Sequence, residues 1–155
     1  MTMGSYRATI SWFNSGPDFT GGKYSRAHQW HFEGGQSVNA TAAPGIVPAP
    51  WSEPANVDPE QAFVAALASC HMLFFLHFAA RQALAVESYH DDADGVMGKN
   101  DAGKQAIIQV TLRPRITFSG PAVPDPEVLD QLHHAAHEHC FIANSVTTRI
   151  LIEPR

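Results

Sequence analysis

The stretch EQAFVAALASCHMLFFLHFAA, residues 60–80, decides how the rest of the chain has to fold. Between Ala62 and Ala80 it contains no Asp, Glu, Lys or Arg, so a helix formed here is apolar on every side. Such a helix must be covered, either by lipid or by protein. Cys70 and His71 stand side by side in its middle, which raises the further question of whether the helix carries a reactive thiol.

The length of this stretch would suffice for a membrane span, because about 20 apolar residues cross a hydrocarbon core of roughly 30 Å. Other features argue against a span. The stretch contains Ser69, His71 and His77, it follows the acidic segment DPEQ, and neither border carries a Trp or Tyr. We therefore expect the core helix of a protein that does not span a membrane.

The start of the helix is marked by three consecutive residues. Asp58 is a good N-cap, Pro59 suits the first helical position, and the charge of Glu60 suits the positive end of the helix dipole. A helix from Pro59 to Ala83 would be about 37 Å long at about 1.5 Å per residue. Because this exceeds the diameter of one small domain, we expect a second subunit to cover part of it, in an intimate homodimer.

Strand and turn patterns precede this helix. The segments YRATISWF, SRAHQWHFEGG and GQSVNATA, separated by Gly-rich turns, predict an antiparallel meander. The segment APGIVPAPWSEP is too rich in proline for a helix or a central strand, so it predicts an extended connection.

Further strands and a second helix follow. AVESYHDDADGVMGK and QAIIQVTLRPRITFSG predict two strands joined by a turn around GKNDAGK. PDPEVLDQLHHAAHEHC predicts a helix capped by Asp125 with Pro126 at its first position, and VTTRILIEP predicts a closing strand. The order of elements predicts an α+β fold, in which an antiparallel sheet wraps around a long buried helix in one domain of residues 1–155.

The composition argues against several kinds of partner. The formal net charge is −5 and the ten Lys and Arg residues are scattered, so we expect no surface for nucleic acid or an anionic membrane. The segment MTMGSYRATISWFNSG lacks the apolar run of a secretory signal, which favours a cytoplasmic location. Thiols stay reduced there unless their oxidation is part of their function, so both Cys70 and Cys140 need an explanation.

Two explanations are open for Cys70. A buried free cysteine is by default a small apolar side chain. Alternatively, a positive group brought near it by the fold would hold it as the thiolate, which is the reactive form.

The second helix also contains a possible metal site. His133, His137 and Cys140 share one helical face, as zinc ligands can. The sequence shows no second group of ligands, so we expect a titratable helix face and no metal or cofactor.

Two segments together resemble the OsmC/Ohr family of thiol peroxidases. DPEQAFVAALASCHMLFFLHFAA is similar to the family's acidic helix start followed by a first cysteine, and HEHCFIANSV is similar to its second-cysteine segment. The resemblance implies an OsmC-like fold, an intertwined homodimer and reduction of organic hydroperoxides. It further implies that Cys70 is the peroxidatic cysteine, that Cys140 resolves it through a disulfide, and that Glu60 orients an arginine beside the thiolate. The reductant implied is a dithiol, for this family a lipoylated protein.

The arginine is where this sequence departs from the family pattern. OsmC-type members carry it shortly before the acidic helix start, where this chain has GIVPAPWSEP with no Arg or Lys. Ohr-type members carry it in an early GGR turn, for which GGKYSRAH is the counterpart. We assign Arg26 as the basic partner of the thiolate, with Lys23 as the alternative. The competing interpretation of Arg26 is an exposed charge of little consequence.

Helix geometry adds a constraint on this site. Glu60 and Cys70 are ten residues apart, about 15 Å along one helix axis, so they cannot meet within one straight helix. They can meet if the helix bends, or if antiparallel packing of two subunits brings Glu60 of one to Cys70 of the other. We expect a site that spans the dimer interface.

Side chains near Cys70 allow two interpretations. Met72, Phe74 and Phe75 would suit an alkyl or fatty-acid hydroperoxide as an apolar wall, with His71 and His28 also lining the site. Their helical spacing favours an ordinary core position. Two other functions stay open: a dimeric binding protein for an apolar ligand, and a hot-dog-type thioesterase, which needs no cysteine.

Overall fold

The computed structural model describes residues 3–155, which form two compact units. The first unit ends at Ala62 and the second begins at Phe63. The expectation of a single domain stays a prediction.

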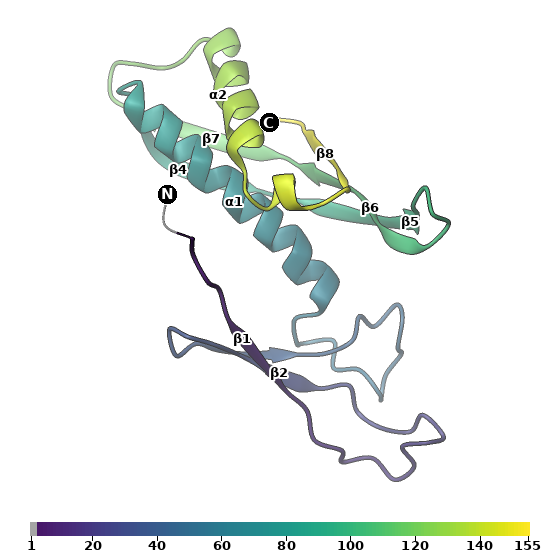
Figure 1. Ribbon diagram of the computed structural model, residues 1–155. Coiled ribbons are helices and arrows are strands. Elements are labelled where there is room, and N and C mark those ends of the chain that lie inside the picture. The colour runs from purple at the N-terminus through teal and green to yellow at the C-terminus, as the bar shows by residue number, and fades with distance from the viewer. Residues whose placement is uncertain (1–2) are drawn as a thin grey trace. The chain divides into compact units, whose positions relative to one another are not determined.

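The first unit contains a three-stranded antiparallel sheet, drawn in purple and blue in Figure 1. Its strands are β1 (Ala8–Ser11), β2 (His28–Phe32) and β3 (Ser37–Ala40), paired in the order β1-β2-β3. The predicted antiparallel meander is thus confirmed. Among the described residues of this unit, the buried ones are small or polar: Ala40, Thr41, Ser52 and Asp58. The unit therefore has no large apolar core of its own.

Helix α1 (Pro59–Arg81) begins as its sequence predicts. The Asp58 carboxylate accepts a hydrogen bond from the Gln61 N–H at 2.7 Å, which satisfies one of the free donors of the first turn. The helix ends at Arg81, two residues before the predicted end at Ala83. Ala83 adopts a left-handed conformation with φ 57°. One stripe of the helix is buried, at a spacing of four residues: Leu67, His71, Phe75 and Ala79.

The second unit has five strands, because each of two predicted strands is divided. β4 (Ala85–Asp91) is followed by β5 (Asp94–Lys99), and β6 (Gln105–Leu112) by β7 (Pro114–Ser119). The prediction of one continuous strand in each place was wrong. At the division, the Arg113 N–H donates to the Asp91 carboxylate at 2.6 Å instead of to a strand partner, and Pro114 has no N–H to donate.

Strand pairing in this unit is mainly antiparallel. β4 pairs with β7, and β5 pairs with β6 around the predicted turn at Asn100–Lys104. The closing strand β8 (Arg149–Ile152) lies parallel to β6, which is an exception to the antiparallel expectation. Gly95 on β5 allows close packing, because a Cβ atom there would lie 2.8 Å from the Val64 side chain of α1.

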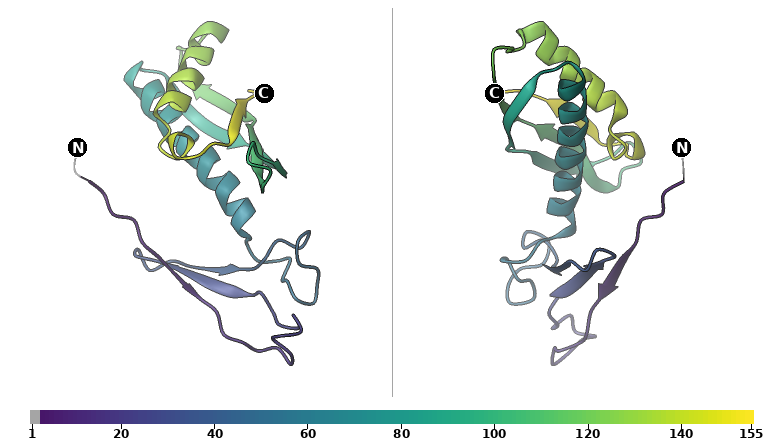
Figure 2. Two further views of the ribbon diagram at one scale, coloured as in Figure 1. Left: turned by 45° about the vertical axis from the view of Figure 1, so that its right-hand side comes forward. Right: turned by 90° about the vertical axis from the view of Figure 1, so that its left-hand side faces the viewer.

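Helix α2 (Pro126–His139) lies beside α1 in both Figure 1 and Figure 2. Its predicted start is confirmed, since the Asp125 carboxylate accepts a hydrogen bond from the Val128 N–H at 2.9 Å. Phe75 and Ala79 of α1 pack against Leu132 and Ala136 of α2 in one buried cluster. A short 3-10 helix, η1 (Ala143–Ser145), follows α2.

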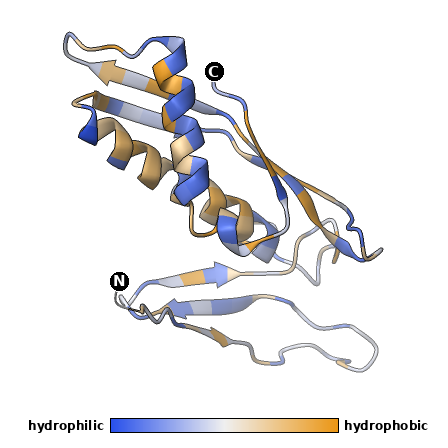
Figure 3. Ribbon diagram, turned by 45° about the horizontal axis from the view of Figure 1, so that its top comes forward, coloured by the Kyte–Doolittle hydropathy of each residue, from blue (hydrophilic) through white to orange (hydrophobic). Residues whose placement is uncertain are grey.

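Hydropathy along the two helices differs, as Figure 3 shows: α1 is mostly apolar along its length, whereas α2 carries many polar residues. A second buried cluster joins Leu67 of α1 to Val110 and Leu112 of β6. The length and composition of α1 would allow a membrane span. Its buried stripe instead packs on α2 and the strands, in an α+β arrangement that confirms the predicted fold class.

Candidate functional site

The two cysteines occupy different environments. Cys70 is a partly exposed residue in the middle of α1, whereas Cys140 follows the last residue of α2 and is 1% exposed. The Cys140 N–H donates to the His137 carbonyl at 3.2 Å, and its Sγ accepts the Ala143 N–H at 3.4 Å. Neither cysteine forms a disulfide in this structure.

The fold brings the two thiols close together. The pKa of Cys140 is raised to about 11, chiefly by burial and also by the neighbouring Cys70 side chain, while the Ala143 N–H lowers it. Cys140 therefore keeps its proton at neutral pH. The default interpretation of two unrelated buried cysteines does not account for this pairing.

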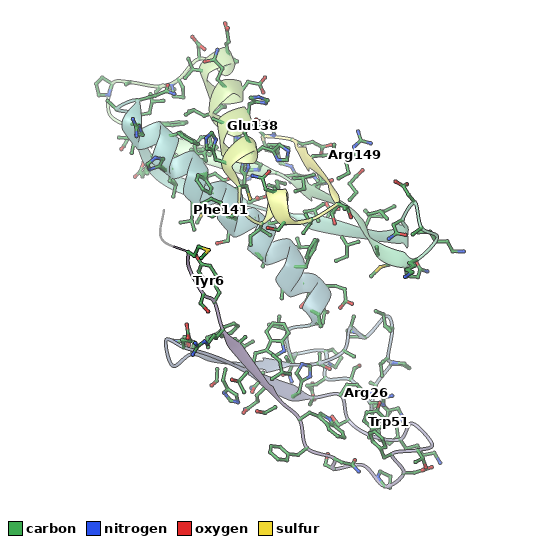
Figure 4. The ribbon with its side chains drawn as sticks, in the orientation of Figure 1. Tyr6, Arg26, Trp51, Glu138, Phe141 and Arg149 are labelled. Carbon is green, nitrogen blue, oxygen red and sulfur yellow. The ribbon has the colours of Figure 1, made fainter. Side chains whose placement is uncertain are left out.

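Two aromatic side chains that are close in sequence to the cysteines contact each other. Phe74 lies one turn after Cys70, and Phe141 directly follows Cys140; their ring centroids are 5.0 Å apart in an edge-on arrangement. Phe141 is 61% exposed and is labelled in Figure 4. Phe75 was also expected near the site, but it is fully buried in the core, in agreement with the competing interpretation.

His71 and His133 form a buried pair, which the sequence did not indicate. Their exposed fractions are 1% and 3%, and His71 Nε2 lies 3.0 Å from His133 Nδ1. Burial lowers the pKa of His71 to about 3 and that of His133 to about 4, so both rings are neutral at physiological pH. His133 thus contacts α1, so it does not belong to a solvent-exposed titratable helix face. In residues 3–155, no group of three or more His, Cys, Asp or Glu side chains could hold a metal ion.

Arg26 is held in place by its own loop. Its guanidinium donates to the carbonyls of Gly22 at 2.9 Å and Tyr24 at 2.6 Å, and its Cζ lies 3.7 Å from the centroid of the Tyr24 ring. Its backbone N–H donates to the Trp51 carbonyl at 2.8 Å, and both residues are labelled in Figure 4. Arg26 is half-buried and not exposed as the competing interpretation has it, whereas Lys23 is exposed. The functional role of Arg26 stays a prediction.

His28 supports this loop. Its Nδ1 lies 2.7 Å from the Arg26 carbonyl, and its Nε2 accepts a hydrogen bond from the Trp30 indole at 2.9 Å. These two contacts require the tautomer with the proton on Nδ1. His28 therefore orients the backbone of Arg26.

Glu60 has an incomplete set of partners. It is half-buried, and its Oε2 is buried without a hydrogen-bond partner among the described residues. No salt bridge within residues 3–155 joins it to Arg26. A buried carboxylate oxygen without a donor is costly, so this position is suited to a further donor.

Comparisons with known proteins identify relatives over the whole chain. A family model described as OsmC-like protein matches residues 52–155. A solved OsmC-like protein of unknown function from Vibrio cholerae is 51% identical, with a TM-score of 0.97, over 99% of this chain and 100% of that one. A comparison with curated proteins found no match.

More distant structures share the fold. The organic hydroperoxide resistance protein OsmC of Legionella pneumophila is 17% identical, with a TM-score of 0.70, over 99% of this chain and 97% of that one. The organic hydroperoxide resistance protein OhrB of Bacillus subtilis is 20% identical, with a TM-score of 0.69, over 97% and 98% of the two chains.

Proposed function

The chain belongs to the OsmC-like protein family, and we propose that it is a thiol-dependent peroxidase that reduces organic hydroperoxides in the cytoplasm. The observation that carries this proposal is the approach of a partly exposed Cys70 to a buried, protonated Cys140. As a member of this family, the chain has a soluble OsmC-like fold in which α1 is the core helix.

The proposed reaction has two steps. The Cys70 thiolate attacks the terminal peroxide oxygen, the O–O bond breaks, and the alkoxide takes up a proton to leave as an alcohol, with Cys70 as the sulfenic acid. The Cys140 sulfur then attacks the Cys70 sulfur. The S–O bond breaks, and the hydroxide leaves as water with the proton from Cys140.

The difference between the two thiols supports these roles. Access favours Cys70 as the group that meets the peroxide, because Cys140 is 1% exposed. The S–H group of Cys140 supplies the proton that the second step consumes. Phe74 and the exposed Phe141 offer apolar contact to the organic part of the substrate.

Arg26 is the proposed cationic partner of the Cys70 thiolate, and Glu60 is proposed to orient it. The ordered guanidinium of Arg26 and the unpartnered oxygen of Glu60 support these roles, and the exposure of Lys23 makes it the weaker choice. Because α1 is one uninterrupted helix, the proposed site joins Glu60 of one subunit to Cys70 of its partner.

The cycle closes when an external dithiol reduces the Cys70–Cys140 disulfide, and a lipoylated protein is the proposed donor. The scheme needs no other cofactor.

The test is the intact mass and free-thiol count of the reduced protein before and after one equivalent of cumene hydroperoxide. We expect the wild type to lose two hydrogens, Cys140→Ser to accumulate a sulfenic acid that dimedone traps, and Cys70→Ser to remain unchanged. Thiols that stay intact in the wild type would contradict the proposal and favour a non-catalytic binding protein.

A further inference from the structure

The buried histidine pair links the same two helices that carry the cysteines. His71 directly follows Cys70 on α1, and His133 lies two turns before Cys140 on nearly the same face of α2. The hydrogen bond between the rings and the approach of the two thiols therefore both involve α1 and the α2 segment, including its C-cap Cys140. Along α2 they are about 10 Å apart.

Apolar side chains also pack between these helices. Phe75 and Ala79 pack on Leu132 and Ala136, and Phe75 also lies against the His133 ring at 4.6 Å between centroids. Apolar packing is non-directional, so it tolerates small rotations and shifts of one helix on the other. A hydrogen bond of 3.0 Å weakens steeply when its distance or angle changes.

The pair also carries an energetic cost that simple core packing would avoid. His71 Nδ1 and His133 Nε2 are buried without hydrogen-bond partners among residues 3–155. Two apolar side chains of similar shape would fill the same space without leaving polar atoms unpaired. Retention of a costly buried polar pair is consistent with a role in fixing one arrangement of the helices.

We propose that His71 and His133 are positioning residues whose hydrogen bond sets the register of α1 on α2 and so holds the Cys140 thiol at the Cys70 sulfur. Disulfide formation requires the two Cα atoms to approach to roughly 4.4–6.8 Å, so a small shift between the helices slows or weakens it. The biological role of this hydrogen bond rests on the proposed function, in which formation of the Cys70–Cys140 disulfide is the second step of the reaction.

The experiment measures the Cys70–Cys140 disulfide directly, without peroxide. Reduced protein is equilibrated in buffers of oxidised and reduced dithiothreitol, quenched with acid and alkylated, and the disulfide fraction is read by mass spectrometry. We expect His71→Phe and His133→Phe to lower the equilibrium constant for the disulfide about tenfold, the effect of losing one buried hydrogen bond. His134→Gln, an exposed histidine of the same helix, is the matched control and leaves the constant unchanged.

Conservative variants separate positioning from general loss of structure. His71→Gln places an amide near the position of Nε2, and His133→Asn places one near Nδ1, so each should recover most of the disulfide constant. Should His71→Phe fail to fold, the comparison of His133→Phe with His133→Asn carries the same test. An unchanged disulfide constant in the folded phenylalanine variants, or a loss that the amide variants do not restore, would overturn the inference.

A second readout separates the two steps of the reaction. In His133→Phe, Cys70 should react with cumene hydroperoxide at the wild-type rate, while its sulfenic acid persists about tenfold longer. A wild type inert to hydroperoxide would refute the proposed function but leave the dithiothreitol measurement valid. A wild type that forms no Cys70–Cys140 disulfide in dithiothreitol would overturn the positioning role.

Discussion

Cys140 illustrates how the environment of a single residue sets its chemistry. It is buried, and its pKa of about 11 leaves about one molecule in a thousand as thiolate at pH 8. Cys70 is partly exposed. We therefore expect iodoacetamide at pH 8 to label Cys70 well before Cys140, because the thiolate is the reacting form. Peptide mass spectrometry over a time course measures both rates, and equal labelling of the two cysteines would contradict this expectation.

Arg26 allows a second prediction at the residue scale. Its guanidinium contacts two carbonyls and the face of Tyr24 at once, which a lysine side chain cannot reproduce. We expect Arg26→Ala to lower kcat/KM for cumene hydroperoxide about 10- to 100-fold, because a positioned charge stabilises the attacking thiolate. Arg26→Lys should recover only part of this loss. Lys23→Ala is the matched control, and an equal loss in that variant would favour Lys23 as the cationic partner.

At the scale of elements, the His71–His133 contact makes the packing of α1 on α2 sensitive to acid. Both rings have a folded-state pKa below the unfolded value of about 6.5, at about 3 and about 4. Between pH 6.5 and pH 4 the unfolded chain therefore binds up to two more protons than the folded one. In this window the free energy of unfolding falls as the pH falls, by up to about 3 kcal/mol per pH unit for the two rings together.

Urea unfolding at pH 7 and pH 5, at one protein concentration, tests this dependence. The wild type should lose more stability than the double variant His71→Phe/His133→Phe, which has no ring to protonate at these positions. The carboxylates are the same in both proteins, so their contribution cancels in the comparison. Equal losses would mean that the pair does not take up protons on unfolding.

Local signals in the sequence predicted some elements and not others. Both helix starts were predictable, because Asp58 and Asp125 cap the backbone only a few residues away. The division of the long strands depends on Asp91 reaching the Arg113 N–H, 22 positions later, and no local pattern indicates such a contact. One weak signal in the sequence indicates that His71 points into the core: it lies four residues from both Leu67 and Phe75, which are apolar.

The candidate site, too, could be predicted from the sequence only in part. The resemblance to the OsmC/Ohr family predicted Cys70 and Cys140 as a pair, but only the folded arrangement brings the two thiols near each other. The contact between His71 and His133 was missed because it links positions 62 apart. The sequence placed His133 on a possible metal-binding face, because helical periodicity shows which residues share one face of a helix. Periodicity does not show which neighbouring element that face contacts.

At the scale of the whole molecule, apolar surface remains for a second subunit to cover. On the side of α1 opposite its buried stripe, Leu73 is 59% exposed. The first unit exposes large apolar side chains, among them Ile10 at 59% and Phe13 at 85%. Covering such surfaces is favourable at about 25 cal/mol per Å² of apolar area, so we expect the chain to form the homodimer that its sequence predicts.

The dimer leads to a prediction about how its two sites are shared. If Glu60 of one subunit serves Cys70 of its partner, Cys70→Ser and Glu60→Gln each impair both sites of their own homodimers. A mixed dimer of the two variants then contains one site with both native residues. Random exchange of subunits makes about half of the dimers mixed, so the mixture should recover about a quarter of the wild-type peroxidase activity.

The mixture is prepared by unfolding the two variants together and refolding them, and the matched control is each variant refolded alone. Activity well above the mean of the two controls places Glu60 and Cys70 on different subunits of one site. If both residues act within one subunit, every Cys70 in the mixture still lacks its Glu60, and the activity stays at the mean of the controls. That outcome would require α1 to bend during the reaction, because ten residues of straight helix hold the two side chains about 15 Å apart along its axis.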